Sequence, residues 1–404
     1  MNYAVIKGSA IFMVPCLPAA GLGYRFMFSY WEQQSFSHYD HIVVGAGIVG
    51  LSVAIELRER YPAASILVLE RGLLPTGAST RNAGFACMGS ATELLDDLQT
   101  SSEAEVTGLF EARKKGLERL RGKLTDKKIG YRENGGYELM SEIELPALDK
   151  LDYLNQLLLP ITGKAAFRPA SEKISSFGFG GNYSKGLIEN NCEGELHSGM
   201  LMRALLDMCT QCRVEIKTGA ETLGFTEEDK QVYVSVKDHF RPEVWLLGCE
   251  TLNICTNAFA KQLLPDVDVT PGRGQVLVTH PIEGLKFRGI YHFDKGYYYF
   301  REIDGRVLFG GGRNLDFEGE RTTDFELNSI IQTDLEQKLA EIILPGTHFQ
   351  VAQRWSGIMA FGSNKYPIVQ AFSKRVYGAF RMGGMGVALG SETAFQLVEL
   401  HENS

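Results

Sequence analysis

Three glycines near the start of the chain constrain its fold more than any other feature. Gly45, Gly47 and Gly50 form a G-x-G-x-x-G pattern that follows the apolar run "IVV" and opens an amphipathic segment. The first glycine makes a tight turn, the second lets the backbone approach a pyrophosphate, and the third lets helix and strand pack closely. Residues 40–70 are therefore predicted to form a dinucleotide-binding unit of strand, turn, helix and strand.

An acidic residue at the end of the second predicted strand narrows the choice of nucleotide. Glu70 lies 20 residues after Gly50, where a carboxylate accepts hydrogen bonds from a ribose diol. The same carboxylate disfavours a 2′-phosphate. Ile48 and Val49 begin the predicted helix, whose free N–H groups and positive dipole end attract phosphates. The expected nucleotide is thus an unphosphorylated adenosine dinucleotide, either NAD or FAD.

The composition fits a protein of two domains without a surface for nucleic acid. The chain has 404 residues and a formal net charge of −8, so it is long for one core and too acidic for a polyanion partner. Its seven cysteines are odd in number and scattered, which favours reduced thiols and a cytoplasmic location over a disulfide framework. No spacing typical of metal ligands is visible, so no metal is expected.

Residues 1–37 are set apart as a leader. Pro15 and Pro18 interrupt its apolar run, which is shorter than the ~18 to 20 apolar residues of a membrane span. No membrane span is therefore predicted. A disordered segment or a start at Met27 is favoured over a cleaved signal peptide.

The polar loop after Glu70 favours FAD over NAD. It reads "ERGLLPTGASTRNAGF", whereas an NAD domain normally continues with another short strand and helix. The chain resembles the D-amino-acid oxidase family of flavoproteins, which includes glycine oxidase, sarcosine oxidase and D-amino-acid dehydrogenase. The resemblance covers residue 40 to the C-terminus and rests on ordered blocks, among them "VVGAGIVG", "GASTRNAGF", "PGRGQ", "GRVLFGGGR", "RWSGI" and "GMGVALG".

The resemblance implies a bound FAD. Non-covalent binding is expected, because neither "STRNAG" nor "GIMAFGSNKYP" contains the Cys or His that covalently flavinylated relatives carry there. The terminal loop is expected to bring backbone N–H groups to the side of the flavin that becomes negative on reduction. The implied cofactor-binding residues are Gly45, Gly47, Ile48, Val49, Gly50, Glu70, Arg71, Ser79, Thr80, Arg81, Asn82, Gly84, Val214, Thr256, Asn257, Gly384, Met385, Gly386, Val387 and Ala388.

The fold class expected from these patterns is α/β, with a discontinuous Rossmann-type FAD-binding domain and an inserted, mainly antiparallel sheet as the substrate domain. A helical region is predicted at 90–124, a hairpin at 130–142 and short strands within 274–312. The expected FAD-binding domain comprises 38–125, 186–257 and 346–404, and the substrate domain comprises 126–185 and 258–345.

The resemblance also implies an enzyme that moves a hydride from substrate carbon to the flavin. The expected substrate is a small amine or amino acid. A 2-hydroxy acid, or a flavin-binding module without activity, stays open as an alternative. No general base is required, because desolvation favours the neutral amine. The sequence leaves the electron acceptor, O₂ or another carrier, undetermined.

One departure from the family concerns the arginine that clamps a substrate carboxylate. In glycine-oxidase-like members it follows "WSGI", but Met359 stands there in this chain. Arg301 is the predicted replacement, since strand alternation puts it on one face with two tyrosines. The alternative is a surface arginine beside core tyrosines. The expected catalytic residues are Arg301, Tyr299, Tyr297, Arg273 and Gln275.

Overall fold

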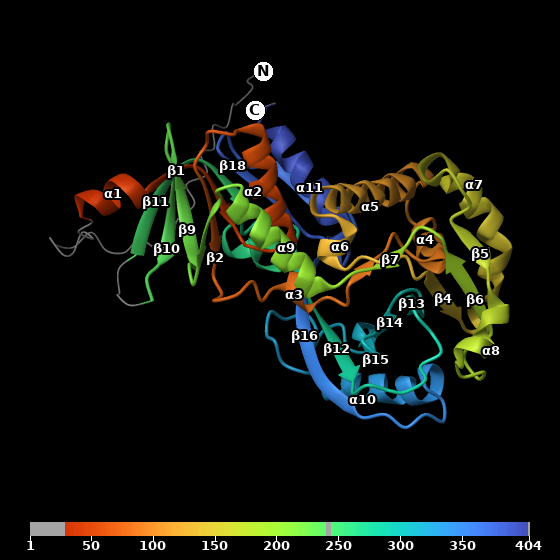
Figure 1. Ribbon diagram of the computed structural model, residues 1–404. Helices are drawn as coiled ribbons and strands as arrows, with labels where there is room; N and C mark the ends of the chain where they lie inside the picture. The colour runs from red at the N-terminus through yellow and green to blue at the C-terminus, as the bar shows by residue number, and fades with distance from the viewer. Residues whose placement is uncertain (1–28, 240–243, 403–404) are drawn as a thin grey trace, which may run out of the picture.

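The computed structural model describes residues 29–239 and 244–402. They form two large sheets with helices packed around them (Figure 1). The first sheet has the strand order β17-β18-β11-β1-β2-β8, and β10 and β9 extend it from β11. Its central strands are parallel, because β1 pairs in parallel with both β2 and β11. The strands are β1 (His38–Val44), β2 (Ile66–Glu70), β8 (Glu215–Thr218), β9 (Thr222–Glu227), β10 (Val232–Lys237), β11 (Val244–Ile254), β17 (Ile368–Ala371) and β18 (Val376–Phe380).

Four helices pack together beside this sheet. They are α2 (Ile48–Arg60), α5 (Glu103–Leu124), α9 (Ser198–Gln211) and α11 (Gly386–Leu400). The unit β1-α2-β2 confirms the strand, helix and strand predicted for residues 40–70. The helical region predicted at 90–124 is two helices, α4 (Ala91–Asp97) and α5, because Ser102 forms a capping box with Glu105 that starts a new helix.

The second sheet has the strand order β16-β12-β15-β14-β13-β4-β6-β5 and is antiparallel except for the pair β13 and β4. The predicted hairpin at 130–142 is wrong, since β4 pairs with β6 and β13 instead of with a neighbouring segment. The strands are β4 (Gly136–Met140), β5 (Phe167–Pro169), β6 (Gly186–Asn190), β12 (Thr270–Thr279), β13 (Ile290–Phe293), β14 (Tyr298–Ile303), β15 (Arg306–Gly311) and β16 (Val351–Phe361).

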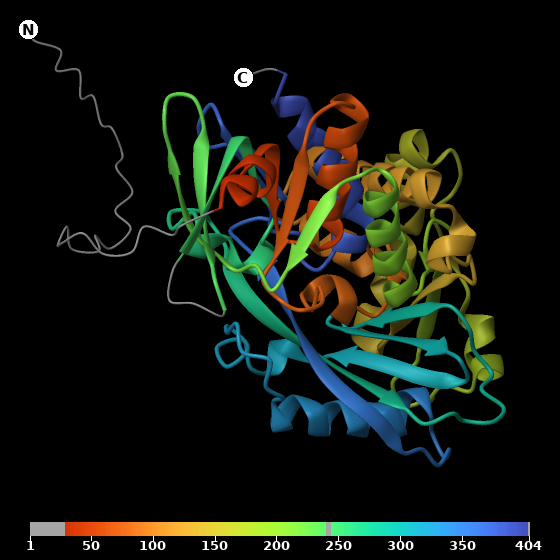
Figure 2. The ribbon, with the colours of Figure 1, turned by 60° about the vertical axis from the view of Figure 1, so that its left-hand side comes forward.

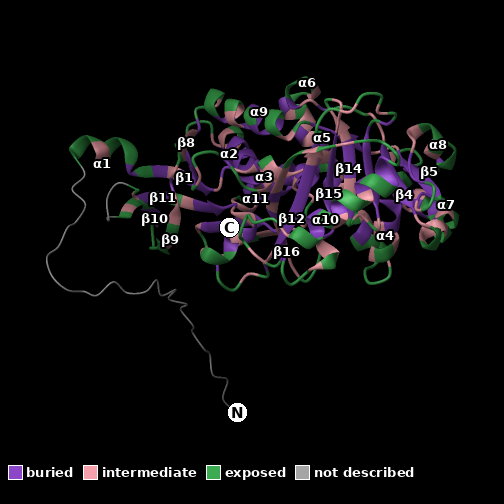
Figure 3. Ribbon diagram, turned by 90° about the horizontal axis from the view of Figure 1, so that it is seen from below, coloured by how far each residue is buried: buried purple, intermediate pink, exposed green. Residues whose placement is uncertain are grey.

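Aromatic side chains fill the core of the second sheet. Tyr291 stacks on Phe300 with ring centroids 4.7 Å apart, and Phe293 stacks on Tyr298 at 4.9 Å. Helix α10 (Ser329–Lys338) adds Ile331 and Leu335 to the same cluster. Strands are largely buried in Figure 3, whereas the outer turns of the helices are exposed. The remaining α-helices of the described residues are α1 (Tyr30–Phe36), α3 (Ala78–Arg81), α6 (Asp126–Ile129), α7 (Leu151–Thr162) and α8 (Ile174–Phe177).

Two long strands, β12 and β16, run from the region of the first sheet into the second (Figure 2). This arrangement agrees with the expected α/β class, in which an antiparallel sheet is inserted into a domain with a parallel sheet. Strands β6 and β16 fall within the expected FAD-binding segments but pair within the second sheet. Of the predicted leader, residues 1–28 lie outside the described residues, and residues 30–36 form α1. Within the described ranges, no helix is long and apolar enough to cross a membrane.

Candidate active site

The glycine turn has the close contacts that its sequence pattern requires. Gly45 has a φ of +104°, and a Cβ added there would lie 2.8 Å from the Cys255 carbonyl oxygen. A Cβ on Gly50 would lie 1.8 Å from the Gly45 oxygen, so the first turn of α2 can approach β1 only through glycine. Gly47 caps α2 without a side chain. The helix therefore presents backbone N–H groups and a positive dipole end.

Glu70 is anchored at the end of β2. Its Oε2 accepts a hydrogen bond from the Ala46 N–H at 3.0 Å, and its Oε1 accepts one from the Gly72 N–H at 2.9 Å. The side chain is buried but lines the cavity described below. The next residue, Arg71, stacks over the Phe259 ring at 3.7 Å. Two fixed hydrogen bonds leave the carboxylate with further lone pairs for a ribose diol.

Short helix α3 (Ala78–Arg81) is tied to its surroundings by the polar residues of the "GASTRNAGF" loop. Ser79 accepts a hydrogen bond from the Ile48 N–H at 3.0 Å. Arg81 donates to the Ser356 carbonyl oxygen at 2.8 Å, and Asn82 accepts from the Gly84 N–H at 2.9 Å. Thr80 donates to the Pro75 carbonyl oxygen at 2.8 Å. These bonds fix the loop against both α2 and β16.

The loop before α11 lines the same cavity as Glu70. Gly383 and Gly384 have positive φ values of +58° and +85°, and Met385 caps α11 without a side-chain hydrogen bond. Asn257 holds the entry to this loop by accepting from the N–H groups of Arg381 and Met382. A second helix N-terminus therefore opens into the same cavity with unpaired backbone donors.

One cavity of about 680 Å³ connects the first sheet to the second. Its size lies within the range of about 300–1,000 Å³ that is usual for ligand sites. Thr256 lines it, and the buried Oγ1 of Thr256 has no hydrogen-bond partner among the described residues. The two helix N-termini, the Glu70 carboxylate and this hydroxyl match the pyrophosphate, ribose and polar edges of FAD. The residues present fit that cofactor.

Most of the expected cofactor residues line this cavity. Four of them do not: Gly50, Thr80, Gly84 and Val214. The Val214 N–H donates to the Cys209 carbonyl oxygen at 2.9 Å. The expected residues that do line the cavity are Gly45, Gly47, Ile48, Val49, Glu70, Arg71, Ser79, Arg81, Asn82, Thr256, Asn257, Gly384, Met385, Gly386, Val387 and Ala388.

The five expected catalytic residues separate into two groups. Tyr297 and Tyr299 line the cavity, whereas Arg273, Gln275 and Arg301 do not. Arg273 donates two hydrogen bonds to Glu320, at 2.9 and 2.8 Å, and Gln275 donates to the same carboxylate at 3.0 Å. Strand alternation along β12 explains this placement, because Gly274 and Val276 line the cavity from the other face.

The guanidinium of Arg301 is buried among backbone acceptors. It donates to the carbonyl oxygens of Leu196 at 2.7 Å and Gly84 at 3.1 Å. Its Nη2 lies 3.4 Å from an oxygen of Glu195. These contacts join β14 to the small sheet of β3 (Phe85–Ala86) and β7 (Gly194–Glu195). Burial lowers the pKa of Arg301.

Arg313 is a cavity residue that the sequence reasoning missed. Gly311 and Gly312 have φ values of +132° and +75°, and this turn carries the chain from β15 into the 3₁₀ helix η4 (Arg313–Leu315). The Arg313 side chain lines the cavity, and its Cζ lies over the rings of Phe361 at 4.0 Å and Phe317 at 4.9 Å. The available signal was an arginine directly after a glycine-rich strand end in "RVLFGGGR".

The cations that line the cavity differ in their partners. Arg113, Lys295 and Lys365 each have a carboxylate oxygen within 3.6 Å. Arg81 donates hydrogen bonds to the carbonyl oxygens of Thr76 and Ser356. The side chains of Arg71 and Arg313 contact aromatic rings, and no hydrogen bond or ion pair joins either side chain to a residue within 29–239 or 244–402. Arg71 adjoins Glu70 at the nucleotide end. Arg313 is thus the unpaired cation next to the second sheet.

Comparisons with known proteins agree with this geometry. The glycine oxidase of Geobacillus kaustophilus superimposes with a TM-score of 0.72 at 19% identity, covering 91% of this chain and 95% of its own. The L-proline dehydrogenase of P. horikoshii gives a TM-score of 0.72 at 16% identity and covers 90% and 93%. A probable oxidoreductase of Haemophilus influenzae, OrdL, is 21% identical over 376 residues, which span 87% of this chain and 80% of that protein.

The family model described as "FAD dependent oxidoreductase", abbreviated DAO, matches residues 40–400. This match spans both sheets and the whole cavity. The chain belongs to the DAO family of FAD-dependent oxidoreductases.

Proposed function

We propose that this flavoenzyme oxidises the carbon–nitrogen bond of a small amino acid whose carboxylate is bound by Arg313. The observation that carries the proposal is that this cation lines the cavity without an anionic partner among the described residues. Burial partly desolvates the charge of Arg313 and thereby lowers its pKa. A substrate carboxylate would balance that charge and accept two parallel hydrogen bonds.

The position of Arg313 relative to Met359 supports the same role. Gly272 and Met359 are paired across β12 and β16, and a Cβ added to Gly272 would lie 2.9 Å from Nη1 of Arg313. Phe361, which contacts the guanidinium, lies two residues after Met359 on β16. The guanidinium therefore lies over the strand pair on which glycine-oxidase-like relatives carry their arginine. Arg313 reaches this place from another element.

The tasks of the remaining groups follow from their positions. When bound, FAD supplies the hydride acceptor. The N-termini of α2 and α11, Glu70 and Thr256 would hold the cofactor, and non-covalent binding stays a prediction. Tyr297 and Tyr299 line the cavity and would lie near the substrate. Desolvation of a bound substrate amine would favour its neutral form, from whose α-carbon a hydride can leave.

The test is anaerobic reduction of the bound flavin by three matched panels of small amino acids, their decarboxylated amines and 2-hydroxy acids. Amino acids should bleach the flavin absorbance, and the corresponding amines should require much higher concentrations. Arg313→Met should raise the KM for the amino acid by about 10- to 150-fold, since hydrogen bonds to charged groups contribute about 1.5–3 kcal/mol. The KM for the amine should be unchanged.

Arg321→Met is the matched control. Arg321 lies on the same loop, is exposed and pairs with Glu318 at 3.3 Å, so its replacement should leave both KM values unchanged. Reduction by 2-hydroxy acids alone would establish the alternative substrate class. No reduction by any panel, with FAD bound, would indicate a binding module without activity. An equal KM for the amino acid in wild type and Arg313→Met would remove Arg313 from the site.

A further inference from the structure

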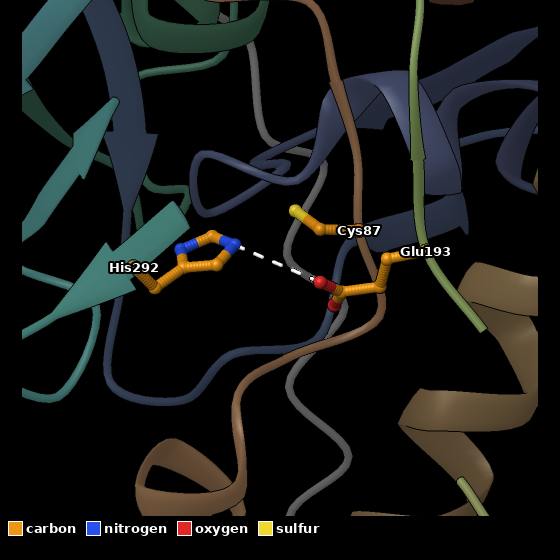
Figure 4. A group of neighbouring side chains, drawn as sticks. All are labelled: Cys87, Glu193 and His292. Atoms are coloured by element: carbon orange, nitrogen blue, oxygen red, sulfur yellow. Dashed lines mark ion pairs between the residues drawn. The ribbon is translucent and has the colours of Figure 1, made fainter. Parts of the chain in front are cut away.

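Three buried side chains from distant segments converge beside the cavity (Figure 4). Cys87 follows β3, Glu193 precedes β7, and His292 lies in β13. Their exposed fractions are 6%, 4% and 8%. One potential ligand atom of each, Sγ, a carboxylate oxygen and a ring nitrogen, lies within 4.8 Å of the other two. The large sequence separations explain why no metal-ligand spacing is visible in the sequence.

These polar atoms converge without bonding to one another. His292 Nε2 is buried and has no hydrogen-bond partner among the residues that the structure describes, and its distance of 3.8 Å to Glu193 Oε2 is too long for a hydrogen bond. The Cys87 Sγ has a weak contact with the Met385 Sδ at 3.6 Å. Buried polar atoms are nearly always satisfied, so an unpaired nitrogen beside a thiol and a carboxyl group requires an explanation.

The carboxyl group of Glu193 is held in place from its other side. Its Oε1 accepts hydrogen bonds from the N–H groups of Met88 at 2.8 Å and Gly89 at 3.1 Å. These donors belong to the segment that carries Cys87, so the backbone fixes the sulfur and the carboxyl group relative to each other. Oε2 remains directed at His292, as Figure 4 shows.

We propose that Cys87, Glu193 and His292 bind a divalent cation of the zinc type, in the wall of the FAD cavity. A thiolate, a carboxylate and a neutral imidazole are all ligands that zinc accepts. The two negative ligands balance the charge of the cation, which allows the ion to be buried. Small side-chain movements would bring the three atoms to the zinc–ligand distances of about 2.0–2.3 Å.

The site is open on one side. Cys87 and His292 line the cavity, whereas Glu193 lies behind them. Three protein ligands with one open position are the arrangement of zinc sites that bind water or a small molecule. The fourth ligand would therefore come from the cavity. A buried water in place of the metal is the competing explanation, and the experiment separates the two.

The test loads the FAD-containing enzyme with Zn²⁺, dialyses it and measures bound metal by mass spectrometry. About one zinc per chain is expected in the wild type. Zinc-edge X-ray absorption should show one sulfur at about 2.3 Å and nitrogen or oxygen ligands at about 2.0–2.2 Å. Cys87→Ser, Glu193→Gln and His292→Asn should each lower the retained zinc at least tenfold.

Cys192→Ser is the matched control, because Cys192 is a free cysteine next to Glu193 but outside the cluster. It should retain zinc like the wild type. The flavin spectrum and melting temperature of every variant report whether it is folded. A wild type that retains no zinc, or zinc without a sulfur ligand, would overturn the proposal. So would full retention in folded Cys87→Ser and His292→Asn proteins.

Discussion

At the scale of single residues, two arginines of the second sheet have opposite surroundings. Arg301 directs its guanidinium at four backbone oxygens and at Glu195. Arg313 lies over aromatic rings, and its side-chain N–H groups donate to no residue in the described part of the chain. A guanidinium saturated by protein acceptors holds segments together, whereas an unpaired one at a cavity is available to an anionic ligand. Replacing Arg301 is therefore expected to lower stability, whereas replacing Arg313 is expected to weaken ligand binding.

Arg301→Met is expected to destabilise the protein by about 3–5 kcal/mol, because it leaves the buried Glu195 carboxylate without its cationic partner. Urea denaturation of the FAD-saturated protein measures this loss. The KM for a carboxylate substrate should stay unchanged in the folded variant. Arg313→Met is the internal comparison, with little loss of stability and a raised KM. Full stability of Arg301→Met together with a raised KM would instead support the clamp expected from the sequence.

At the scale of elements, one glycine sets the distance between α5 and α11. A Cβ on Gly116 of α5 would lie 2.0 Å from the Ala388 carbonyl oxygen, in the first turn of α11. That turn lines the FAD cavity. Close helix packing here therefore positions the backbone N–H groups that face the cofactor.

Gly116→Ala should weaken FAD binding at least tenfold and destabilise the protein by about 1–3 kcal/mol, because overpacking shifts backbone. Equilibrium dialysis and urea denaturation measure the two effects. Gly122→Ala on the same helix is the control, since nothing lies within 4 Å of its added Cβ. This variant should keep its FAD affinity and gain up to about 1 kcal/mol of stability. Wild-type FAD affinity in Gly116→Ala would show that α11 does not depend on this contact.

The elements that could be predicted from the sequence are those with local signals. The glycine turn, α2 and strands β12 to β15 follow from periodicity and turn residues. The hairpin at 130–142 failed because β4 pairs with segments about 50 and 150 residues away, and no local pattern encodes such partners. The break in the helical region at Ser102 carried a capping signal, Ser-x-x-Glu, that periodicity alone overlooks.

Local sequence patterns also fail to predict which residues of the second sheet line the cavity. Residues next to the glycine turn and the terminal loop line the cavity as the motifs imply. Arg273 and Gln275 belong to a family block, but the direction of a side chain depends on strand register, and both point toward Glu320. The position of Arg313 depends on two glycines with positive φ after β15. Arg313 lies 46 positions before Met359 in the chain, and no sequence pattern indicates that the two residues lie close together.

At the scale of the whole molecule, the stability of the protein depends on buried ionisable groups in the first sheet. His41 of β1 is such a group, with 7% of its surface exposed. Its Nδ1 lies 2.8 Å from Thr251 Oγ1 on β11, and its ring lies 5.1 Å from that of Tyr61. Burial lowers the pKa of His41 to about 4.

This pKa predicts how the stability of the whole protein depends on pH. The unfolded chain binds a proton at His41 below pH about 6.5, whereas the folded chain does not until pH about 4. The free energy of unfolding should therefore fall as the pH is lowered from 6.5 to 4, by about 1–3 kcal/mol from this residue. His41→Asn should reduce the slope in that window, measured by urea denaturation of FAD-saturated protein, and part of the slope should remain because burial also lowers the pKa of the neighbouring His401 to about 4. His348→Asn, at an exposed position, should follow the wild type. If the free energy of unfolding of all three proteins changes with pH in parallel, the pKa of His41 is the same in the folded and the unfolded chain.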